Sequence, residues 1–482
     1  MRSRTIKLLH PVAGRPMVAL ALETVQALSP SRVIGVVGFQ ADKVRKALDG
    51  YGCTFVLQKE QRGTGHAVLQ AARAIGSASR STLLIVNGDV PLLRPATLRG
   101  LLAKHRRSGA ALTVLTTLLE DPTGYGRVVR NAQSRLTRIV EHRDANVEQR
   151  RIREINSGIY CAHPAKLLST LKRIKPNNAQ GEYYLTDLIA LAVRSNVAVE
   201  GLSAQSAEEV AGVNDRQQLA QLERHYQARE AERLMYSGVT LADPARLDIR
   251  GTVVAGEDCF IDINVVLEGQ VRLGRRVSIG PGVVVKDTQI GDDVAIAAHT
   301  VIEGATVAAG CQLGPFARIR PGTELAENVK IGNFVETKKA RLGRGTKASH
   351  LSYLGDATLG EGCNIGAGTV TCNYDGIDKH HTHIGDNVFI GTNSTLVAPL
   401  EIGAESFVAA GSTITSKVGT RELAVSRGRQ RNIEGWTRPV DRTGQRPANR
   451  TSQRPADRTG QRPVDATKQP AQTKPVATDG ES

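Results

Sequence analysis

The chain has 482 residues, of which 40% are hydrophobic and only 4% aromatic, and its formal net charge is +16. That length predicts roughly two to four domains, and the charge favours phosphates, nucleotides or nucleic acid as partners. Six cysteines without CxxC spacing argue against a disulfide framework or a zinc site, and we find no signal peptide and no membrane span. We therefore expect a cytoplasmic protein that handles an anionic molecule.

The first region, residues 1–214, alternates strand-like and helix-like stretches. Aliphatic runs at 32–38, 54–58 and 81–89 read as strands, and "GHAVLQAARAIG" at 65–76 reads as helix. This alternation predicts an α/β domain with a mostly parallel sheet, in which ligands bind beyond the carboxyl ends of the strands. Asp89 follows such a strand directly, so it is a candidate site residue.

A charged segment follows at 215–238. Asp215 and Gln218 form a potential capping box, and Gly238 is a potential stop signal. The segment is predicted to be one long linker helix.

The third region, residues 239–435, has a different periodicity. Aliphatic residues recur every six positions in two runs: Val301, Val307, Leu313, Ile319, Leu325 and Ile331, then Ile384, Ile390, Leu396, Ile402, Val408 and Ile414. Six fits neither the helical period nor strand alternation, and it is typical of a hexapeptide-repeat β-helix with an aliphatic ladder inside.

The repeat slips phase twice, and such interruptions tend to build the binding face of a repeat protein. The slips and the segment before them contain cations, amides, phenols and a histidine: Arg318, Arg320, Lys338, Lys339, His350, Tyr353, Asn364, Asn373, Tyr374 and Lys379. This set suits a phosphorylated substrate and a proton-transfer step.

The tail, residues 436–482, carries the imperfect octapeptides "DRTGQRPA", "NRTSQRPA" and "DRTGQRPV". It is basic, rich in Pro and almost without large apolar residues, so it cannot bury a core, and we predict that it is disordered. Its removal from about Thr437 is expected to leave folding and acetyl transfer essentially unchanged.

Across nearly the whole chain to about residue 440, the sequence resembles one enzyme family. The matching motifs in the first half are "QRGTGHA", "NGDVPLL", "DPTGYGRVVR", "EHRDA", "EINSGIY", "NNAQGEYYLTD" and "GVNDR". Those in the second half are "GPFARIRPG", "GNFVETKKARLG", "HLSYLGD", "NIGAGTVTCNYDG" and "EGWTRP". The family is that of the bifunctional bacterial N-acetylglucosamine-1-phosphate uridylyltransferases / glucosamine-1-phosphate N-acetyltransferases.

The resemblance implies a Rossmann-like nucleotidyltransferase domain followed by a left-handed parallel β-helix of hexapeptide repeats. The β-helix would transfer acetyl from acetyl-CoA to glucosamine-1-phosphate, and the first domain would couple the resulting N-acetylglucosamine-1-phosphate to UTP with Mg²⁺. The product, UDP-N-acetylglucosamine, would serve cell-wall peptidoglycan and lipopolysaccharide synthesis. A homotrimer is also implied.

For acetyl transfer, the resemblance assigns the general base to His350. It assigns the sugar phosphate to Arg320 and Lys338, and orientation of the sugar to Tyr353 and Asn364. The acetyl-CoA positions are Ala367, Asn373, Tyr374, Thr392, Ala410 and Arg427. The family commonly has Ser where Thr392 stands, and we expect the extra methyl group to be tolerated.

For uridylyl transfer, the resemblance assigns the Mg²⁺ ligands to Asp89 and Asn214, which offer the oxygen donors that this ion prefers. Lys7 matches a phosphate-binding lysine. Uracil-binding positions are Gln58, Gly63 and Thr64, and positions that contact the acetylated sugar are Gly126, Glu141, Asn156 and again Asn214.

The segment "MRSRTIKLLH" matches only the last part of the family's opening motif, with Ile6 in place of the usual proline. The family's first strand and its Gly-rich loop come before that part. We expect an in-frame upstream extension that encodes them, and little uridylyltransferase activity from the chain that starts at Met1.

Three other interpretations remain open on the sequence. The chain could be a monofunctional acetyltransferase with an inactive first domain, or an acyltransferase of the same fold that acts on another amino-sugar. A nucleic-acid-binding scaffold would need basic residues interleaved with aromatics on a folded surface, and the tail from Thr437 has no aromatic residue. We therefore expect no specific nucleic-acid partner.

Overall fold

The computed structural model describes residues 1–76 and 81–438. Its contacts divide the chain into two units, Met1–Arg427 and Gly428–Ser482. The described part of the second unit, 428–438, contains neither helix nor strand. The disorder predicted for the tail concerns residues that mostly lie outside the described part of the chain.

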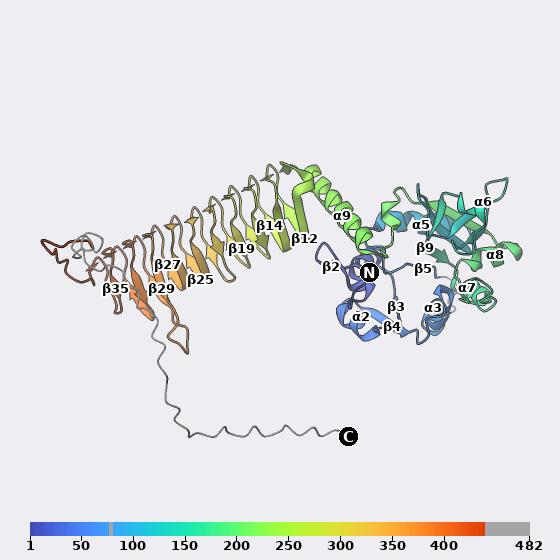
Figure 1. The fold of residues 1–482 in the computed structure, drawn as a ribbon, viewed down its shortest axis with the longest axis horizontal. Coiled ribbons are helices and arrows are strands. Elements are labelled where there is room, and N and C mark those ends of the chain that lie inside the picture. The colour runs from blue at the N-terminus through green and yellow to red at the C-terminus, as the bar shows by residue number, and fades with distance from the viewer. Residues whose placement is uncertain (77–80, 439–482) are drawn as a thin grey trace, which may run out of the picture. The chain divides into compact units, whose positions relative to one another are not determined.

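The first region of the chain alternates helices and strands, as predicted (Figure 1). Its α-helices are α1 Met17–Gln26, α2 Ala41–Ala47, α3 Thr64–Gln70, α4 Ala72–Ile75, α5 Pro95–Ser108, α6 Val147–Arg150, α7 Pro164–Leu171 and α8 Asp187–Arg194. Short 3-10 turns are η1 Lys7–Leu9 and η2 Glu208–Val210. Its strands are β1 Pro11–Val12, β2 Arg15–Pro16, β3 Val33–Val37, β4 Cys53–Leu57, β5 Leu83–Ile85, β6 Leu112–Leu118, β7 Arg127–Arg130, β8 Leu136–Val140, β9 Glu154–Ala162 and β10 Val199–Ser203.

A mixed sheet of six strands forms the centre of this region. Strands β10, β6, β9, β7 and β8 follow one another across it, and β5 also pairs with β9. The β10–β6 pair is parallel, whereas β9 runs antiparallel to β5, β6 and β7. The prediction of a mostly parallel sheet is therefore wrong for these pairs, because β9 returns through the middle of the sheet.

Alternating side chains of this sheet enter two separate cores. Val114 of β6 packs in a cluster with Leu167 of α7 and Leu188 of α8. The next residue, Leu115, packs in a different cluster with Leu98 and Leu101 of α5. Successive strand residues point to opposite faces, so helices cover both sides of the sheet.

Strands β3 and β4 form a parallel pair that is separate from the six-stranded sheet. A cavity of about 260 Å³ lies between β3 and β5, lined by Ile34 and Val36 of β3 and by Leu83 and Ile85 of β5. The backbone edges of β3 and β5 are thus not joined to one another by a strand among the described residues.

The linker helix α9, Arg216–Tyr236, has the N-terminal cap that the sequence predicts. Asp215 Oδ1 accepts a hydrogen bond from the backbone N–H of Gln218 at 2.8 Å. The Gln218 side chain accepts from the backbone N–H of Asn214 at 2.7 Å rather than from Asp215. The capping interaction therefore also fixes Asn214, a predicted site residue. Among the described residues, no helix is long and apolar enough to span a membrane.

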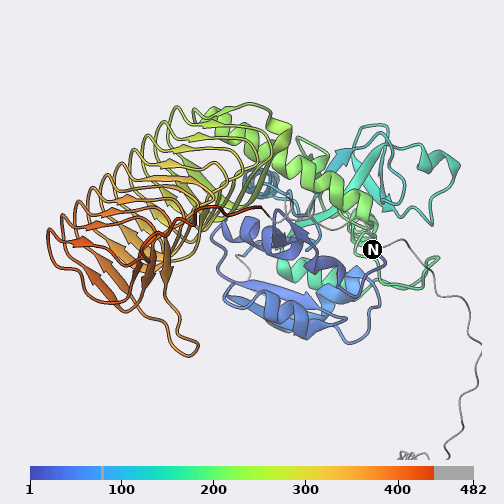
Figure 2. The ribbon, with the colours of Figure 1, turned by 60° about the vertical axis from the view of Figure 1, so that its left-hand side comes forward.

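Beyond α9 the chain winds into a parallel β-helix with three faces, visible as a stack of coils in Figures 1 and 2. Long strands bend around a corner, so that β14 pairs with β16 through one half and with β17 through the other. The short 3-10 turn η3 Pro244–Arg246 separates β11 from β12. The first face contains β11 Thr240–Leu241, β13 Phe260–Ile261, β15 Ser278–Ile279, β18 Ala295–Ile296, β21 Gln312–Leu313, β24 Lys330–Asn333, β26 Lys347–His350, β28 Asn364–Ile365, β31 Phe389–Ile390, β34 Phe407–Val408 and β36 Leu423–Ala424. The other two faces contain β12 Leu247–Ala255, β14 Val265–Leu273, β16 Val284–Lys286, β17 Gln289–Ile290, β19 Val301–Glu303, β20 Thr306–Val307, β22 Arg318–Ile319, β23 Glu324–Leu325, β25 Glu336–Leu342, β27 Tyr353–Leu359, β29 Val370–Cys372, β30 Thr382–Ile384, β32 Thr395–Val397, β33 Leu400–Ile402 and β35 Thr413–Ile414.

One continuous core of Val, Ile, Leu, Ala and Cys runs through the β-helix. All the predicted ladder residues from Ile384 to Ile414 are buried, which confirms the hexapeptide pattern there. The prediction for Val301 is wrong, because Ile302 is the buried residue of that strand. The step from Ile302 to Val307, the next residue of the predicted ladder, spans five positions rather than six, so a strict period misplaces the first position.

Candidate functional sites

A polar cavity of about 210 Å³ lies in the first region of the chain, where residues after β5 meet β9 and the start of α9. Its lining includes six predicted residues: Thr64, Asp89, Gly126, Glu141, Asn156 and Asn214. Residues from six separate stretches of sequence thus meet around one cavity. Because α/β sheets bind ligands at the carboxyl ends of their strands, the position after β5 is a suitable one.

Lys7 contacts two of these residues at once. Its Nζ lies 2.6 Å from Asp89 Oδ2 and 3.1 Å from Asn214 Oδ1. Two oxygen donors from distant parts of the chain therefore converge on a single cation. A carboxylate and an amide oxygen suit Mg²⁺, which usually keeps water and substrate phosphates as its remaining ligands. Within residues 1–76 and 81–438, no group of three or more His, Cys, Asp or Glu side chains forms a closed metal site.

Gln58 and Gly63 lie beside the cavity without lining it. The Gln58 amide donates to the backbone carbonyl of Gly63 at 3.2 Å, and Thr64 Oγ1 accepts from the backbone N–H of Leu185 at 3.1 Å. A side chain at Gly63 would meet the Tyr183 carbonyl at 2.7 Å, and its φ of +103° also favours glycine. The segment is therefore held close to the 183–185 loop.

Two residues at this cavity were not predicted from the sequence, although both lie within the matching motifs. Tyr160 Oη donates to Asn156 Oδ1 at 3.0 Å, and Thr186 Oγ1 donates to Glu141 Oε1 at 3.0 Å. Burial raises the pKa of both Tyr160 and Glu141. These two contacts fix the side chains that face the proposed sugar position.

Arg127 holds the loop that carries Gly126. It is buried, its guanidinium donates to the backbone carbonyl of Tyr125, and its Nη2 lies 3.3 Å from His142 Nδ1. Glu141, the neighbour of His142, is thereby tied to the same loop.

The β-helix brings several predicted residues together along one of its corners. At this corner each coil places one outward residue directly before a residue with positive φ, namely Leu351 after His350 and Asn393 after Thr392. Backbone hydrogen bonds join successive coils here, since Asn393 N donates to Ala367 O at 2.7 Å and Gly411 N to Thr392 O at 2.8 Å. The corner line that results consists of Asn333, His350, Ala367, Thr392 and Ala410.

Coils in register are separated by about 4.8 Å, so the stretch from His350 to Ala410 covers roughly 14 Å. Arg427 ends the line, with its Nη1 donating to Ala410 O at 2.8 Å. Glycines permit the close stacking, because a Cβ on Gly391 would lie 2.4 Å from Ala410 N. From His350 onward, the line is thus a narrow strip that begins at a histidine and ends at an arginine.

Cations gather on the face next to His350. Arg320 Nη1 lies 2.6 Å from Glu336 Oε1, and Glu336 pairs in register with Tyr353. Lys338 lies close enough to Lys379 to lower the pKa of that ammonium through hydrogen bonding and like-charge repulsion. Two ammonium groups held together in this way favour an anion between them.

The second repeat interruption forms a small hairpin over this area. Tyr374 and Lys379 form an antiparallel bridge, and Asp375 accepts from the backbone N–H groups of Ile377 and Asp378. Asn373 donates to Asp356 and lies 3.5 Å from Tyr353 Oη. Asn364 lies on the neighbouring face, in register with Lys347. Lys379 belongs among the candidate anion ligands, although the family resemblance did not place it in the predicted site.

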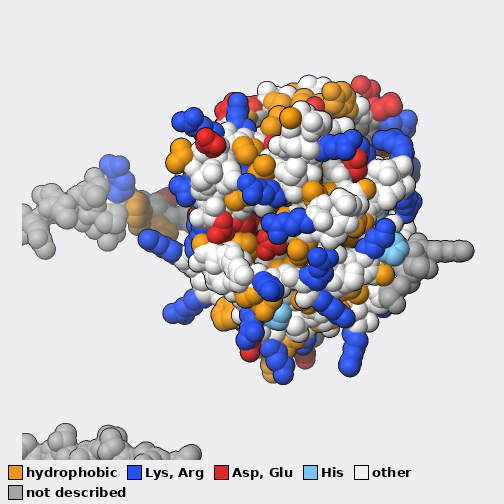
Figure 3. Space-filling model, turned by 90° about the vertical axis from the view of Figure 1, so that its right-hand side faces the viewer, with side chains coloured by type: hydrophobic (Ala, Val, Ile, Leu, Met, Phe, Trp, Pro, Cys, Tyr) orange, Lys and Arg blue, Asp and Glu red, His pale blue; other side chains and the backbone are white. Residues whose placement is uncertain are grey.

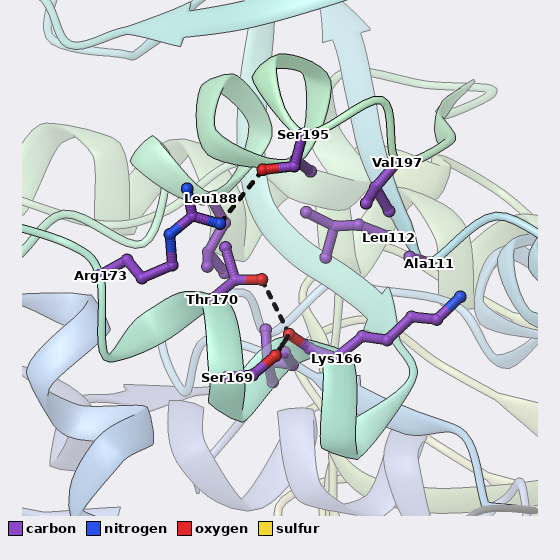
Figure 4. Close-up of a pocket in the computed structure, with 11 residues that line it drawn as sticks. Ala111, Leu112, Lys166, Ser169, Thr170, Arg173, Leu188, Ser195 and Val197 are labelled. Carbon is purple, nitrogen blue, oxygen red and sulfur yellow. Dashed lines mark hydrogen bonds between the residues drawn. The ribbon is translucent and has the colours of Figure 1, made fainter.

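A further hollow of about 220 Å³ lies between β6, α7 and α8 (Figure 4). Arg173 Nη1 donates to Ser195 Oγ at 3.1 Å, and the Ser169 and Thr170 hydroxyls donate to the Lys166 carbonyl. Figure 4 shows these polar groups bonded within the protein around an apolar floor. None of the predicted site residues lines this hollow.

Three family models match the chain. The MobA-like NTP transferase domain matches residues 1–171, the GMPPB C-terminal domain matches 249–342, and the bacterial transferase hexapeptide (six repeats) matches 381–416.

Whole relatives also match. The bifunctional protein GlmU of Marinobacter nauticus is 51% identical over 439 residues, which cover 91% of this chain and 96% of that protein. The protein of the same name from Pseudomonas entomophila is 52% identical over 439 residues, 91% of this chain and 95% of that protein. That of Idiomarina loihiensis is 51% identical over 444 residues, 92% of this chain and 96% of that protein.

Proposed function

This chain belongs to the family of the bifunctional protein GlmU, and on that premise we propose which residues carry out each of its two reactions. It is an N-acetyltransferase and a UTP-dependent nucleotidyltransferase of UDP-N-acetylglucosamine synthesis, with a nucleotidyltransferase domain followed by a hexapeptide-repeat region. The corner line from His350 to Arg427 is the observation that carries the assignment of the acetyl-transfer site.

In the acetyl-transfer reaction, the amine of glucosamine-1-phosphate attacks the thioester carbonyl of acetyl-CoA. An ammonium ion has no lone pair for this attack, so a base must accept a proton from the amine as the new C–N bond forms. His350 Nε2 is the proposed base. The thiolate of coenzyme A leaves and takes up a proton.

The strip of small residues beyond His350 is the proposed binding surface for acetyl-CoA. Ala367, Thr392 and Ala410 follow one another on the line, so an extended chain could lie along it with its thioester end at His350. Arg427, which contacts Ala410 at the far end of the strip, and the hairpin residues Asn373 and Tyr374 are proposed as further acetyl-CoA contacts. Thr392 is exposed, and Ala occupies the same corner position in the neighbouring coils at 367 and 410, which supports the expectation that the extra methyl group is tolerated.

The sugar phosphate is proposed to bind between Arg320, Lys338 and Lys379. The like-charge contact between Lys338 and Lys379 is relieved when a dianion enters, so part of the binding energy comes from that relief. Tyr353 and Asn364 are proposed to orient the sugar ring, so that its amine faces His350.

In the uridylyl-transfer reaction, a phosphate oxygen of N-acetylglucosamine-1-phosphate attacks the α-phosphorus of UTP and pyrophosphate leaves. Such reactions depend on positioning and on neutralising charge. Asp89 and Asn214 are the proposed ligands of Mg²⁺, which when bound would neutralise charge on the phosphate oxygens. Lys7, already between these two oxygens, is placed to bind a phosphate group nearby.

The remaining cavity residues are proposed to select the two substrates. Gln58, Gly63 and Thr64 would contact uracil, and Gly126, Glu141 and Asn156 would contact the acetylated sugar. The contacts of Tyr160 with Asn156 and of Thr186 with Glu141 support this division, because they preset both sugar-facing side chains.

We also propose that the chain acts as a cytoplasmic homotrimer without a nucleic-acid partner. Hexapeptide repeats match residues 381–416, and all six cysteines are free thiols, which suits a reducing compartment. Figure 3 shows Lys and Arg side chains spread among other types over one face of the molecule. Light scattering at micromolar concentration should give three times the mass of one chain, and a monomer would contradict the proposal.

The proposed function is tested by product analysis on the purified full chain. Glucosamine-1-phosphate with acetyl-CoA should give the N-acetylated sugar phosphate, and addition of UTP and Mg²⁺ should give a detectable amount of UDP-N-acetylglucosamine and pyrophosphate. Acetylation of a different amino-sugar in preference to glucosamine-1-phosphate would contradict the substrate assignment.

A further inference from the structure

Asn333 occupies, one coil before His350, the same position on the corner line. The two residues pair in register between β24 and β26, and His350 Nδ1 lies 2.7 Å from Asn333 Oδ1. Leu351 N also donates to Asn333 O at 3.0 Å, so the two backbones are joined beside the side-chain contact.

The chemistry of this contact determines which ring nitrogen of His350 carries the proton. An amide oxygen only accepts hydrogen bonds, so Nδ1 must be the N–H donor in the pair. In a neutral imidazole the other nitrogen, Nε2, then carries a lone pair and can act as a base. The reverse tautomer would leave two acceptors facing each other at 2.7 Å.

The fold itself does not require an amide at this position. In other coils the equivalent corner residue is Pro281, Ala298, Pro315, Ala367 or Ala410, each directly before a residue with positive φ. At residue 333 the positive φ belongs to the next residue, Phe334, so Asn333 is not there to relieve backbone strain. The amide of Asn333 is therefore available to accept a hydrogen bond from His350.

A neutral acceptor also suits the proposed substrate. A carboxylate at position 333 would orient the ring equally well, but it would add negative charge beside a site assigned to a sugar phosphate. An amide fixes the tautomer without that repulsion.

We propose that Asn333 is a positioning residue for acetyl transfer, which holds His350 with Nδ1 protonated and Nε2 free to accept the proton of the substrate amine. This inference rests on the proposed role of His350 as the base. The Asn333 side chain acts through its contact with the ring and takes no part in the bonds that form and break.

The test compares full-length variants at this position. Asn333→Ala should fold, because Ala occupies the same corner in other coils, and its kcat for acetyl transfer should fall by roughly 10–100-fold, the range typical for partners that orient a functional histidine. The KM values for both substrates should stay within about twofold, since Asn333 is proposed to act only through the His350 ring. Asn333→Leu removes the acceptor at similar size and should lose as much, whereas Asn333→Asp restores an acceptor and should recover part of kcat.

Two measurements separate this role from a structural one. A long-range proton–nitrogen NMR spectrum of histidine-labelled protein, assigned with His350→Gln, should show Nδ1 protonated in the native chain and a mixture of tautomers in Asn333→Ala. Gln312→Ala, which removes an exposed amide from β21 of the same face, should change neither the spectrum nor kcat.

A kcat of Asn333→Ala within about twofold of the native value, or a His350 ring protonated at Nε2, would overturn the inference. The variant His350→Ala distinguishes a failure of the proposed base from a failure of the positioning role of Asn333. If it retains full turnover, the proposed base is wrong. If it loses turnover while Asn333→Ala does not, only the positioning role is wrong.

Discussion

Lys7 Nζ lies 2.6 Å from Asp89 Oδ2, although 82 positions of sequence separate the two residues. The same ammonium contacts Asn214 at 3.1 Å, so one lysine joins the first turn of the chain, the end of β5 and the start of α9. Both partners are the proposed metal ligands. A substitution of Lys7 should therefore change uridylyl transfer without changing acetyl transfer.

Lys7→Gln keeps a polar side chain but removes the positive charge. Loss of a preorganised group of this kind typically costs about 10²–10³ in rate, so uridylyl transfer should fall by that factor. Acetyl transfer, measured on the same preparation, should be unchanged, because its proposed residues lie in the β-helix. A parallel fall in both rates would show that the variant had disturbed the whole chain.

His350→Ala should lower kcat for acetyl transfer by roughly 10²–10⁴, the usual contribution of a general base. Acetyl-CoA binding, measured by calorimetry, should remain near normal, because the proposed strip for the coenzyme begins one coil further on. Here uridylyl transfer is the internal control. Turnover within a few-fold of the native chain would mean that His350 is not the base.

The sequence predicts the core of the β-helix better than its corners. A buried ladder leaves a direct trace in the sequence, because every position that points inward must be apolar, as from Ile384 to Ile414. The corner line leaves almost none. Its members share only a place in the coil, where Pro315, Ala298 and Asn333 are equally acceptable to the backbone, so the partner of His350 becomes visible only when the coils are stacked.

The first region shows the opposite limitation. The aliphatic runs at 32–38 and 54–58 place β3 and β4 to within one residue at each end, but the local pattern does not show which strands pair with them. The antiparallel return of β9 depends on long-range pairing. Thr186 was missed for the same reason, since its contact is with Glu141, 45 positions away. The contact of Tyr160 with Asn156 lies within β9, but the sequence does not show that the two side chains meet.

Glu141 should make stability depend on pH in a defined direction. Burial raises its pKa above the ordinary value of 4.5. Below 4.5 the carboxyl is protonated in both the folded and the unfolded chain; above it, the unfolded chain ionises first, so stability is lost as pH rises through the higher folded pKa. Glu141→Gln should therefore raise Tm at pH 7, and the gain should vanish below about pH 4.5.

Glu154 provides the control of opposite sign. Burial would raise its pKa, but hydrogen bonds from Arg130 outweigh this and the pKa is lowered. Ionised Glu154 therefore stabilises the fold above its ordinary pKa, and this contribution is lost as pH falls through the lowered folded value. Glu154→Gln should lower Tm at pH 7. Thermal melts of both variants across the acid range test the pair, and shifts of the same sign would contradict the assignment.

The corner line offers the sharpest test of where acetyl-CoA binds. Ala410 is exposed, and Ala298 occupies the same corner in a coil on the other side of His350, away from the proposed strip. Ala410→Glu and Ala298→Glu thus place the same carboxylate in the same local backbone.

On the proposed strip, the new charge would face the phosphates of the coenzyme at short range. Repulsion between close like charges costs on the order of 1–2 kcal/mol at a partly exposed site, so KM for acetyl-CoA should rise about tenfold in Ala410→Glu. High salt should reduce that increase, because exposed charges are screened. Ala298→Glu should leave the KM unchanged, and neither variant should alter uridylyl transfer. Equal effects from the two variants would place the coenzyme elsewhere than along Ala367, Thr392 and Ala410.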